Sequence, residues 1–509
     1  MRANTQHKAD GNAGITIIGL GPGDERMLTR EAWDALCCAE EVYLRTRHHP
    51  TVEHLPTHPK VHTFDAVYEQ HDTFDQVYDA IAHEIIRLGD RPAGVVYCVP
   101  GHPLVGESTV QRILEWAPAS GLAVHLVSGL SFVEPALEAL GIDALDGLQI
   151  ADGTRLAQGH HPWINPDLPA LIAQVYNRVV ASGVKLALMN LYHDDHPVVI
   201  IKAAGGPSHS HHEIRLYELD WQDDLDHLTT VFVPPVAKRS SVATFQDVIA
   251  RLRAPGGCPW DREQTHQTLE SNLLEETYEV LAALDADDPT KLCEELGDLL
   301  LQIVLHAQIA TEEETFKAVD VLQGIIAKME RRHPHVFGDA QANDSQEVLR
   351  NWEQIKRDER DDPARSLFDG IPKGLPALAQ ALELQRRAAR VGFDWDTPEP
   401  VLAKVAEEAG EIQRAEDADA RLDEFGDLLF SLVNAARWME IDPETALRHA
   451  NQRFAARFQH IEQGAAAAGR LLEDMSLAEM DVLWEQAKAG EAGDAPHAPN
   501  RQKEVSDHA

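Results

Sequence analysis

The sequence is poor in cysteine, and its few cysteines follow no pattern. Its 509 residues include five cysteines, and none of them forms a C-x-x-C pair. A secreted domain held together by disulfides needs paired cysteines, and a structural zinc site needs closely spaced ones, so both classes are excluded. The scattered, odd-numbered set indicates reduced thiols and therefore a reducing, cytoplasmic compartment.

Long apolar runs are also missing. No uninterrupted apolar stretch reaches the ~18 residues that a membrane-spanning helix requires. The first residues, MRANTQHKADGNAG, are polar and lack the apolar core of a secretory signal. The sequence therefore predicts a soluble protein with no membrane partner. Residues 1–13 and the polar stretch 490–509 are expected to be disordered.

Positive charge is scarce. The chain has 84 acidic residues against 45 lysines and arginines, which gives a formal net charge of −39. A surface this acidic repels a phosphodiester backbone, so extended nucleic acid is excluded as a partner. Aromatic residues make up only 6%, so aliphatic side chains must fill the cores. Clustered carboxylates can also hold hard divalent cations, through which phosphate ligands are reached.

The pattern of apolar residues divides the chain into an α/β part and a helical part. Up to about Val233, short apolar runs such as ITIIGLGPGD and GVVYCVPGHP end in glycine or proline turns and alternate with helical segments. Such strands are typical of α/β domains that bind ligands at the carboxyl ends of the strands. From Phe245 onward the apolar spacing is helical. We therefore expect a multidomain chain, with an α/β domain over 14–235 and an all-α region whose repeats cover 242–362 and 366–488.

The helical region contains an internal repeat. NLLEETYEVLAAL followed by LCEELGDLLLQIVLHA resembles KVAEEAGEIQRA followed by RLDEFGDLLFSLVNAA. The acids align one for one: Glu276, Glu279, Glu295 and Asp298 in the first copy, and Glu408, Glu411, Glu424 and Asp427 in the second. A glycine precedes each aspartate, at Gly297 and Gly426. Because a glycine inside a helix costs up to about 1 kcal/mol relative to alanine, its recurrence favours a close approach by a helix or a ligand.

These acids have the spacing of a metal site. Acids three residues apart share one face of a helix, and the apolar stripes beside them would pack the two helices of each copy together. Clustered carboxylates repel one another unless a cation neutralises them. Mg²⁺ or Mn²⁺ would do so, and would bind substrate phosphates and activate water. A lone E-x-x-E is more often a solvated helix face, but two matched sets within apolar helices favour the metal.

Basic residues follow each acidic set, and an unusual loop precedes the first. Lys328, Arg331, Arg332 and His333 follow the first set, and Arg453 and Arg457 follow the second. Lys328, Arg331, Arg332, Arg453 and Arg457 are candidates for binding a triphosphate, and equally for interacting with helix C-termini and nearby acids. The segment CPWD, residues 258–261, is either a wall on which a base stacks or a hydrophobic plug, and the plug is the preferred interpretation.

On the motifs GGCPWDREQTHQTL, EELGDLLLQIVLHA, KMERRHPHVFGD and EFGDLLFSLVNAARW, residues 242–462 resemble the MazG family. The resemblance implies an all-α, usually dimeric enzyme that hydrolyses nucleoside triphosphates to the monophosphate and pyrophosphate, a housecleaning activity. It implies that both acidic sets bind metal, and that Glu276, Glu279, Lys328, Glu408 and Glu411 carry catalysis. The linker between the two helices is shorter in the second copy, which argues against equal activity of the copies.

The α/β part contains three glycine loops. The first, within IIGLGPGDERMLT (17–29), has neither G-x-G-x-x-G nor G-K-[ST], so dinucleotide and P-loop sites are excluded. Together with YLRT, PGHPLVGEST and SGLSF, it resembles the tetrapyrrole methylase family over residues 14–235. The resemblance implies two α/β domains that bind S-adenosylmethionine between them, with Pro22, Gly101, His102, Pro103 and Ser131 lining the site. Many members have Gly-Asp-Pro at 101–103, so the histidine argues against ordinary precorrin or uroporphyrinogen methylation.

Three functions are compatible with the whole chain. The first is a pyrophosphohydrolase with an attached domain that binds S-adenosylmethionine and has an unknown acceptor. The second is a methyltransferase whose helical part is a dimerisation or regulatory module. The third is a regulatory protein that binds either ligand without turnover. The intact acids in both copies favour the first.

The two acidic sets should be separable by mutation. We expect Glu276→Gln with Glu279→Gln to remove at least half of the hydrolysis rate, and Glu408→Gln with Glu411→Gln to remove the remainder. Glutamine is nearly isosteric, so each pair of changes lowers metal affinity without unfolding the helices. The first copy carries the larger share because Lys328, Arg331 and Arg332 supply more positive charge than Arg453 and Arg457. Initial rates of the two double variants test this, and a fully active first variant beside a dead second one would contradict it.

Overall fold

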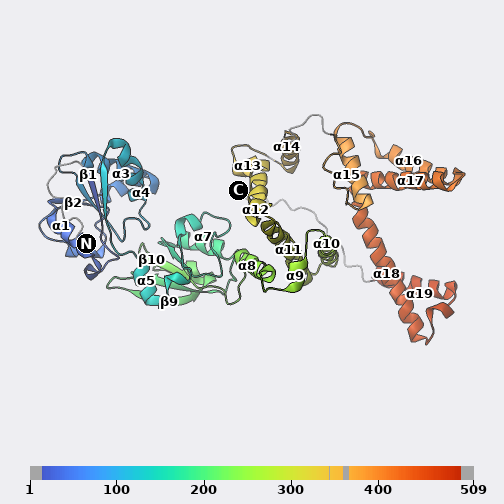
Figure 1. The fold of residues 1–509 in the computed structure, drawn as a ribbon, viewed down its shortest axis with the longest axis horizontal. Helices are drawn as coiled ribbons and strands as arrows, with labels where there is room; N and C mark the ends of the chain where they lie inside the picture. Colours follow the sequence, from blue (N-terminus) through green and yellow to red (C-terminus); the bar gives the residue numbers. More distant parts are fainter. Residues whose placement is uncertain (1–13, 343, 359–365, 494–509) are drawn as a thin grey trace. The chain divides into compact units, whose positions relative to one another are not determined.

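The structure is a computed structural model that describes residues 14–342, 344–358 and 366–493. The chain forms two compact units, Met1–Ala327 and Lys328–Ala509 (Figure 1). The expected disordered end at 1–13 lies outside the described residues, as does 494–509. The last helix extends to Gly493, beyond residue 490, where the C-terminal tail was expected to begin.

The first unit begins with an all-parallel sheet in the order β3-β2-β4-β1-β5. Its strands are β1 (Gly14–Gly19), β2 (Glu41–Leu44), β3 (Lys60–Thr63), β4 (Val95–Val99) and β5 (Ala123–Val127). The connecting helices are α1 (Arg30–Cys38), α2 (Asp65–Tyr68), α3 (Phe74–Gly89) and α4 (Ser108–Trp116). The glycine loops follow β1, β4 and β5, which are neighbours in the sheet.

Both faces of this sheet are covered, as all-parallel sheets require. Side chains alternate along β1, so Ile15 and Ile17 pack with α3 and α4 on one face. Ile18 packs with Ala32 and Leu36 of α1 on the other face. These isoleucines are fully buried, which explains why β1 reads as an almost continuous apolar run.

A second, mixed sheet follows in the order β6-β7-β10-β8-β9. Its strands are β6 (Gln149–Asp152), β7 (Ala170–Ala173), β8 (Pro197–Lys202), β9 (Ser210–Arg215) and β10 (Thr229–Val233). Strands β6 and β7 are parallel, and the other neighbours are antiparallel. Helix α5 (Val133–Leu140) covers one face and α7 (Arg178–Leu188) the other, while α6 (Gly153–Leu156) joins β6 to the next segment.

Helices complete the first unit. They are α8 (Val242–Arg253), α9 (Pro259–Glu263), α10 (Glu270–Asp285), α11 (Pro289–Glu312) and α12 (Ala318–Arg332), which continues into the second unit. Helices α10 and α11 form a hairpin, and Asp288 caps the N-terminus of α11 by accepting from the backbone N–H groups of Thr290 and Lys291. Ile249 of α8, Leu269 and Leu305 form the small core that fixes this hairpin on α8.

The second unit is helical throughout its described residues. Its helices are α13 (Pro334–Phe337), α14 (Ser345–Asp358), α15 (Ala377–Arg390), α16 (Pro398–Arg414), α17 (Ala418–Trp438), α18 (Pro443–Ala467) and α19 (Leu477–Gly493). Helices α16 and α17 form a second hairpin, and α15 packs against α17. The side-chain amide of Gln385 on α15 donates to the backbone oxygen of Phe430 at 2.8 Å.

The expected fold class is confirmed: an α/β part is followed by a part whose described residues contain helices and no strand. Strand β10 ends at Val233 and α8 begins at Val242, on either side of the predicted change near residue 236. The compact units, however, divide within α12 between Ala327 and Lys328. The sequence does not mark this place, because the helix runs through it without a break.

Much apolar surface on the helical hairpins has no cover within the described chain. Leu296, Leu300 and Ile303 on α11 are exposed, and so are Phe425, Leu429 and Leu432 on α17. Along α12 the same holds for Val321, Leu322, Ile325 and Ile326. Exposed apolar stripes of this extent are unusual in a soluble monomer and mark surfaces for association. Among the described residues, no helix is long and apolar enough to cross a membrane.

Candidate functional site

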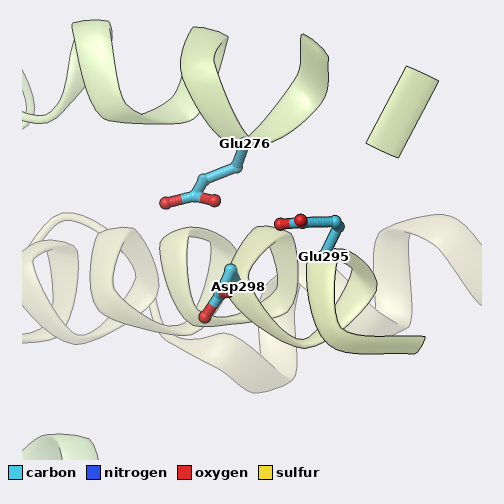
Figure 2. A group of neighbouring side chains, drawn as sticks. All are labelled: Glu276, Glu295 and Asp298. Atoms are coloured by element: carbon cyan, nitrogen blue, oxygen red, sulfur yellow. The ribbon is translucent and has the colours of Figure 1, made fainter. Parts of the chain in front are cut away.

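The first carboxylate set lies in the hairpin of α10 and α11. Glu276 projects from α10 towards Glu295 and Asp298 of α11 (Figure 2). One oxygen from each of these three side chains lies within 4.8 Å of the other two. Glu295 is buried, and the other two are partly buried. The apolar packing of the hairpin therefore brings together acids that are far apart in the sequence.

Glu279, the fourth predicted member, lies beside this group of three. Its carboxyl group lies within interaction distance of that of Glu295. The structure therefore brings three acids within metal-binding distance of one another and places the fourth next to them.

The carboxylates of this set repel one another, which raises the pKa values of two of them. Burial, Asp298 and Glu279 raise the pKa of the Glu276 carboxyl. Burial and Glu279 also raise the pKa of Glu295, against the opposing charge of Lys291. A divalent cation removes this repulsion, because it stabilises all the ionised carboxylates at once. The donor set, oxygen atoms only, suits a hard cation such as Mg²⁺.

The second carboxylate set repeats this arrangement in α16 and α17. Oxygens of Glu408, Glu424 and Asp427 lie within 4.8 Å of one another. Burial, Glu411 and Glu408 raise the pKa of Glu424. The sequence alignment of the two copies therefore corresponds to a repeated geometry. One difference stands out: the ammonium group of Lys404 lies 2.7 Å from Glu408.

The two glycines before the aspartates have no steric explanation within the chain. A methyl carbon added at Gly297 or at Gly426 would meet no described atom within 4 Å. The expected close approach of a helix is therefore wrong for the described chain. Close approach by a ligand at Gly297 and Gly426 stays a prediction.

The basic residues are placed on α12 and α18. Lys328, Arg331 and Arg332 belong to the second compact unit, whereas the first carboxylate set belongs to the first. The guanidinium of Arg332 lies over the ring of Trp352, and that of Arg457 lies over Trp484. Arg453 is exposed on α18. The ring of His333 lies with Nδ1 2.7 Å from the backbone oxygen of Met329.

The CPWD loop is not a hydrophobic plug. Trp260 is 57% exposed, so the preferred interpretation from the sequence is wrong for the described chain. The loop is nevertheless firmly held. Arg253 donates to the backbone oxygens of Asp261 and Gln264 and forms a bidentate pair with Glu312 of α11. Two ring nitrogens, Nδ1 of His266 and Nδ1 of His306, lie 2.8 Å apart beside it.

The three glycine loops of the α/β part converge at the carboxyl end of the first sheet. Gly21 and Gly101 exchange backbone hydrogen bonds of 3.2 and 2.8 Å. A side chain at Gly19 or Gly129 would collide with the backbone oxygen of Gly101, at 2.5 and 2.4 Å. The loops thus pack backbone against backbone. A parallel sheet places its ligand crevice at this edge.

The predicted binding residues lie on or beside these loops. Pro22 is buried against Gly205 of the loop after β8, where an added methyl carbon would lie 2.7 Å from the proline ring. Pro103 is buried in the second loop. Ser131 is buried, and its hydroxyl donates to Glu134 at 2.6 Å. The structure therefore gathers Pro22, Gly101, Pro103 and Ser131 at one edge of the sheet.

The side chain of His102 stabilises the turn of the second glycine loop, as an aspartate side chain can. Its Nδ1 accepts a hydrogen bond from the backbone N–H of Leu104, two residues on, at 3.0 Å. Aspartate side chains accept from the same position in turns. The histidine therefore preserves the turn while removing a negative charge from the loop.

Sequence reasoning missed a buried ion pair next to these loops. Arg45 follows β2, and its Nη1 lies 3.3 Å from Glu107 at the start of α4. Burial raises the pKa of Glu107 to about 7, although Arg45 opposes the shift. Burial and the charge of Arg45 lower the pKa of His49 to about 4. The sequence feature that could have indicated this ion pair is Arg45 itself, which directly follows an apolar strand in the segment YLRT.

A two-sheet α/β part followed by helical hairpins with paired carboxylates is the architecture of a two-part enzyme. Residues 14–220 match the model of the tetrapyrrole (corrin/porphyrin) methylases, and residues 264–337 match that of the MazG nucleotide pyrophosphohydrolase domain. The chain belongs to the MazG family, in a form that carries an N-terminal tetrapyrrole methylase domain. Both resemblances inferred from the sequence motifs are thereby confirmed.

Some relatives match nearly the whole chain, and others match about half of it. A Bacillus subtilis (strain 168) protein described as uncharacterized protein YabN is 43% identical over 494 residues, which are 94% of this chain and 99% of the relative. The nucleoside triphosphate pyrophosphohydrolase of Escherichia coli (strain K12) is 47% identical over 251 residues, 48% of this chain and 95% of the relative. A solved uroporphyrin-III C-methyl transferase from Thermus thermophilus, complexed with S-adenyl homocysteine, matches 43% of this chain and 97% of its own at 18% identity and a TM-score of 0.34.

The raised carboxyl pKa values predict that metal and pH act together on stability. Ionising Glu276 and Glu295 costs the folded state, so metal-free protein loses stability as the pH rises through their raised pKa values. Added Mg²⁺ should restore what is lost. We expect the difference in Tm between samples with Mg²⁺ and with EDTA to widen from about pH 5 to about pH 8.

Scanning calorimetry of the full chain measures this difference. Glu276→Gln should shrink it, whereas Glu270→Gln, an exposed acid on the same helix outside the set, should leave it unchanged. A Mg²⁺ effect of the same size at both pH values would contradict the assignment.

Proposed function

We propose that this chain hydrolyses nucleoside triphosphates to the monophosphate and pyrophosphate, with Mg²⁺ or Mn²⁺ bound at the carboxylate sets. The observation that carries this proposal is the convergence of Glu276, Glu295 and Asp298 from two helices, repeated by Glu408, Glu424 and Asp427. The pyrophosphohydrolase relatives support it, because their similarity covers 95% of the Escherichia coli protein's length. Sets of oxygen donors of this kind hold a hard cation that in turn binds phosphate.

The residues of the first set divide the chemical work. Glu276, Glu295 and Asp298 would hold the metal, which when bound neutralises the polyphosphate and lowers the pKa of water. Glu279 lies beside Glu295, and we propose that it takes the proton that an attacking water releases. Lys328, Arg331 and Arg332 remain our proposed contacts to the triphosphate in the first copy, and Arg453 and Arg457 in the second. We also propose that Glu408 and Glu411 act in the second copy as Glu276 and Glu279 do in the first.

The active form is proposed to be a homodimer built through the helical region. The exposed apolar stripes on α11, α12 and α17 support this, since a second copy would remove them from water. The five free thiols support a reducing, cytoplasmic location. With a net charge of −39, neither extended nucleic acid nor an anionic membrane surface is a proposed partner.

A second candidate function belongs to the α/β part, which we propose binds S-adenosylmethionine. Supporting it are the three converging backbone loops and their position at the carboxyl edge of a parallel sheet. Side chains are excluded at Gly19 and Gly129, so the loops themselves pack backbone against backbone at this edge. If the helical region served only for dimerisation, this site would carry the whole activity as a methyltransferase of unknown acceptor.

A triphosphate panel tests the hydrolase. With Mg²⁺ we expect one pyrophosphate per triphosphate consumed and no free orthophosphate, because the metal-bound carboxylates act on the polyphosphate as a unit. Glu270→Gln should keep the wild-type rate, and a variant that carries Glu276→Gln and Glu408→Gln should lose at least ~100-fold. Turnover in excess EDTA, or release of single phosphates, would count against the proposal.

Calorimetric titration tests the second candidate. S-adenosylmethionine and S-adenosylhomocysteine should bind the wild-type chain, and Gly101→Ala should abolish binding. Gly101 has a φ of 66° and lies in the cradle, so an added methyl group both strains the backbone and fills the cradle. Gly121→Ala is the matched control, since Gly121 has a φ of 70° and lies outside it with open space around it. Equal binding by both variants, or no binding by the wild type, would refute the site.

A further inference from the structure

The junction between the second sheet and the first helices is held by one carboxylate. We propose that Asp167 joins the second sheet and the first carboxylate hairpin into one cooperative unit, so that a ligand bound in the α/β part also stabilises the hairpin. The junction itself does not depend on what either part binds. Its response to ligand rests on the proposed function, because that response needs an occupied site in the α/β part.

Asp167 lies in the loop before β7 and binds the start of α8. Its carboxylate accepts from the backbone N–H groups of Ser240, at 2.7 Å, and of Ser241, at 3.1 Å. It also accepts from the hydroxyl group of Ser241, at 2.7 Å, and from that of Thr244. These partners follow Asp167 by 73 to 77 positions, so the contacts are tertiary rather than local.

The same carboxylate completes the N-terminal cap of α8. Ser241 is the N-cap residue, and its Oγ accepts from the backbone N–H of Thr244 at 3.1 Å. Because the hydroxyl group donates its hydrogen to Asp167, its lone pairs are directed towards the helix. A negative charge at this end also interacts favourably with the helix dipole. Helix α8 therefore takes part of its capping from a residue of the α/β part.

The loop that carries Asp167 is fastened to the second sheet. The backbone N–H of Asp167 donates to Oδ1 of Asn165 at 2.9 Å, and the backbone N–H of Asn165 donates to Oε1 of Gln149 on β6 at 2.7 Å. The amide of Gln149 donates in return to the backbone oxygen of Asn165 at 2.9 Å. Residues 170–172 of β7, which follow, are fully buried. The loop is therefore a rigid support for α8.

Strand β7 runs from this junction to the crevice of the α/β part. At its carboxyl end Gln174 has a φ of 63°, which is uncommon for a residue other than glycine. Its Nε2 lies 3.7 Å from the position that a methyl carbon on Gly106 would occupy, so this side chain faces the loop after β4. One buried strand thus connects the crevice with the support of α8.

Helix α8 extends the connection to the first hairpin. Ile249 packs with Leu305 of α11, and Arg253 forms a bidentate pair with Glu312 near the end of α11. The same helix α11 carries two acids of the first carboxylate set. Releasing α8 from the sheet would weaken the support of this hairpin. We therefore expect the two parts to open together, and a ligand that stabilises one to stabilise the other.

The junction persists over the ordinary pH range. Although burial acts in the opposite direction, hydrogen bonds from Ser241, Thr244 and the backbone of Ser240 lower the pKa of Asp167 to about 2. A carboxyl group with a depressed pKa contributes stability above its unfolded pKa of roughly 4, and this stability is lost as the pH falls through about 2. The connection is therefore permanent at neutral pH.

Hydrogen exchange of the full chain, read by mass spectrometry, tests the inference. We expect Asp167→Ala to speed exchange in α8, α10 and α11 by about tenfold, since the loss of an N-cap has an effect of this order. Exchange in β1 and β4 of the first sheet should stay unchanged. Asp167→Asn, which keeps the size of the side chain and one acceptor oxygen, should have a smaller effect in the same helices.

Asp143→Ala is the matched control. Asp143 also caps a short helix, Ala144–Asp146, by accepting from the backbone N–H of Leu145 at 2.9 Å. Both partners of this contact lie within the α/β part. The control should therefore leave exchange in α8, α10 and α11 unchanged.

S-adenosylhomocysteine is the probe for the response to ligand. In the wild type it should slow exchange in α8 and α11 as well as in the two sheets. In Asp167→Ala it should slow exchange in the sheets alone, because the ligand site is intact and its connection to the hairpin is lost.

Three results would overturn the inference. One is unchanged exchange of α11 in Asp167→Ala, and another is equal loosening of α11 by Asp143→Ala. The third is a wild type in which S-adenosylhomocysteine protects the sheets but neither α8 nor α11. If this probe protects no segment of the wild type, the proposed ligand of the α/β part fails, while the comparison of the two alanine variants still decides the junction.

Discussion

The mutual repulsion of carboxylates held on a rigid helical hairpin is the constraint on which the helical part depends. Apolar packing of α10 on α11, and of α16 on α17, brings three acids of each set within 4.8 Å of one another. The hairpin cannot relax this repulsion by moving an acid to solvent, because Glu295 and Glu408 are buried. The repulsion favours either protonation of these carboxyl groups or a neighbouring positive charge.

The two hairpins meet this constraint in different ways. In α16, a lysine one turn before the buried acid supplies the charge from within the chain. In α10 an asparagine, Asn272, occupies the same place.

The α/β part follows another principle, in which the backbone rather than the side chains shapes the site. Gly19, Gly101 and Gly129 lie so close together that a methyl group on Gly19 or Gly129 would collide with the main chain of a neighbouring loop. Charged groups at this edge are buried and mutually compensated, as in Arg45 and Glu107. His102 holds the turn at this edge by accepting a hydrogen bond from the backbone N–H of Leu104.

The sequence by itself determined the order of the parts, the paired helices and the repeated acids. These are local properties: apolar periodicity, glycine turns and fixed spacing on a helix. It could not determine that Trp260 is exposed, since an aromatic residue in a loop is compatible with either environment. Nor could it show how the surroundings of the two acidic sets differ. Lys404 and Lys291 both precede an acid by one turn, and only the packing of the hairpins decides that one ammonium group reaches a buried carboxylate at 2.7 Å while the other stays 3.8 Å away.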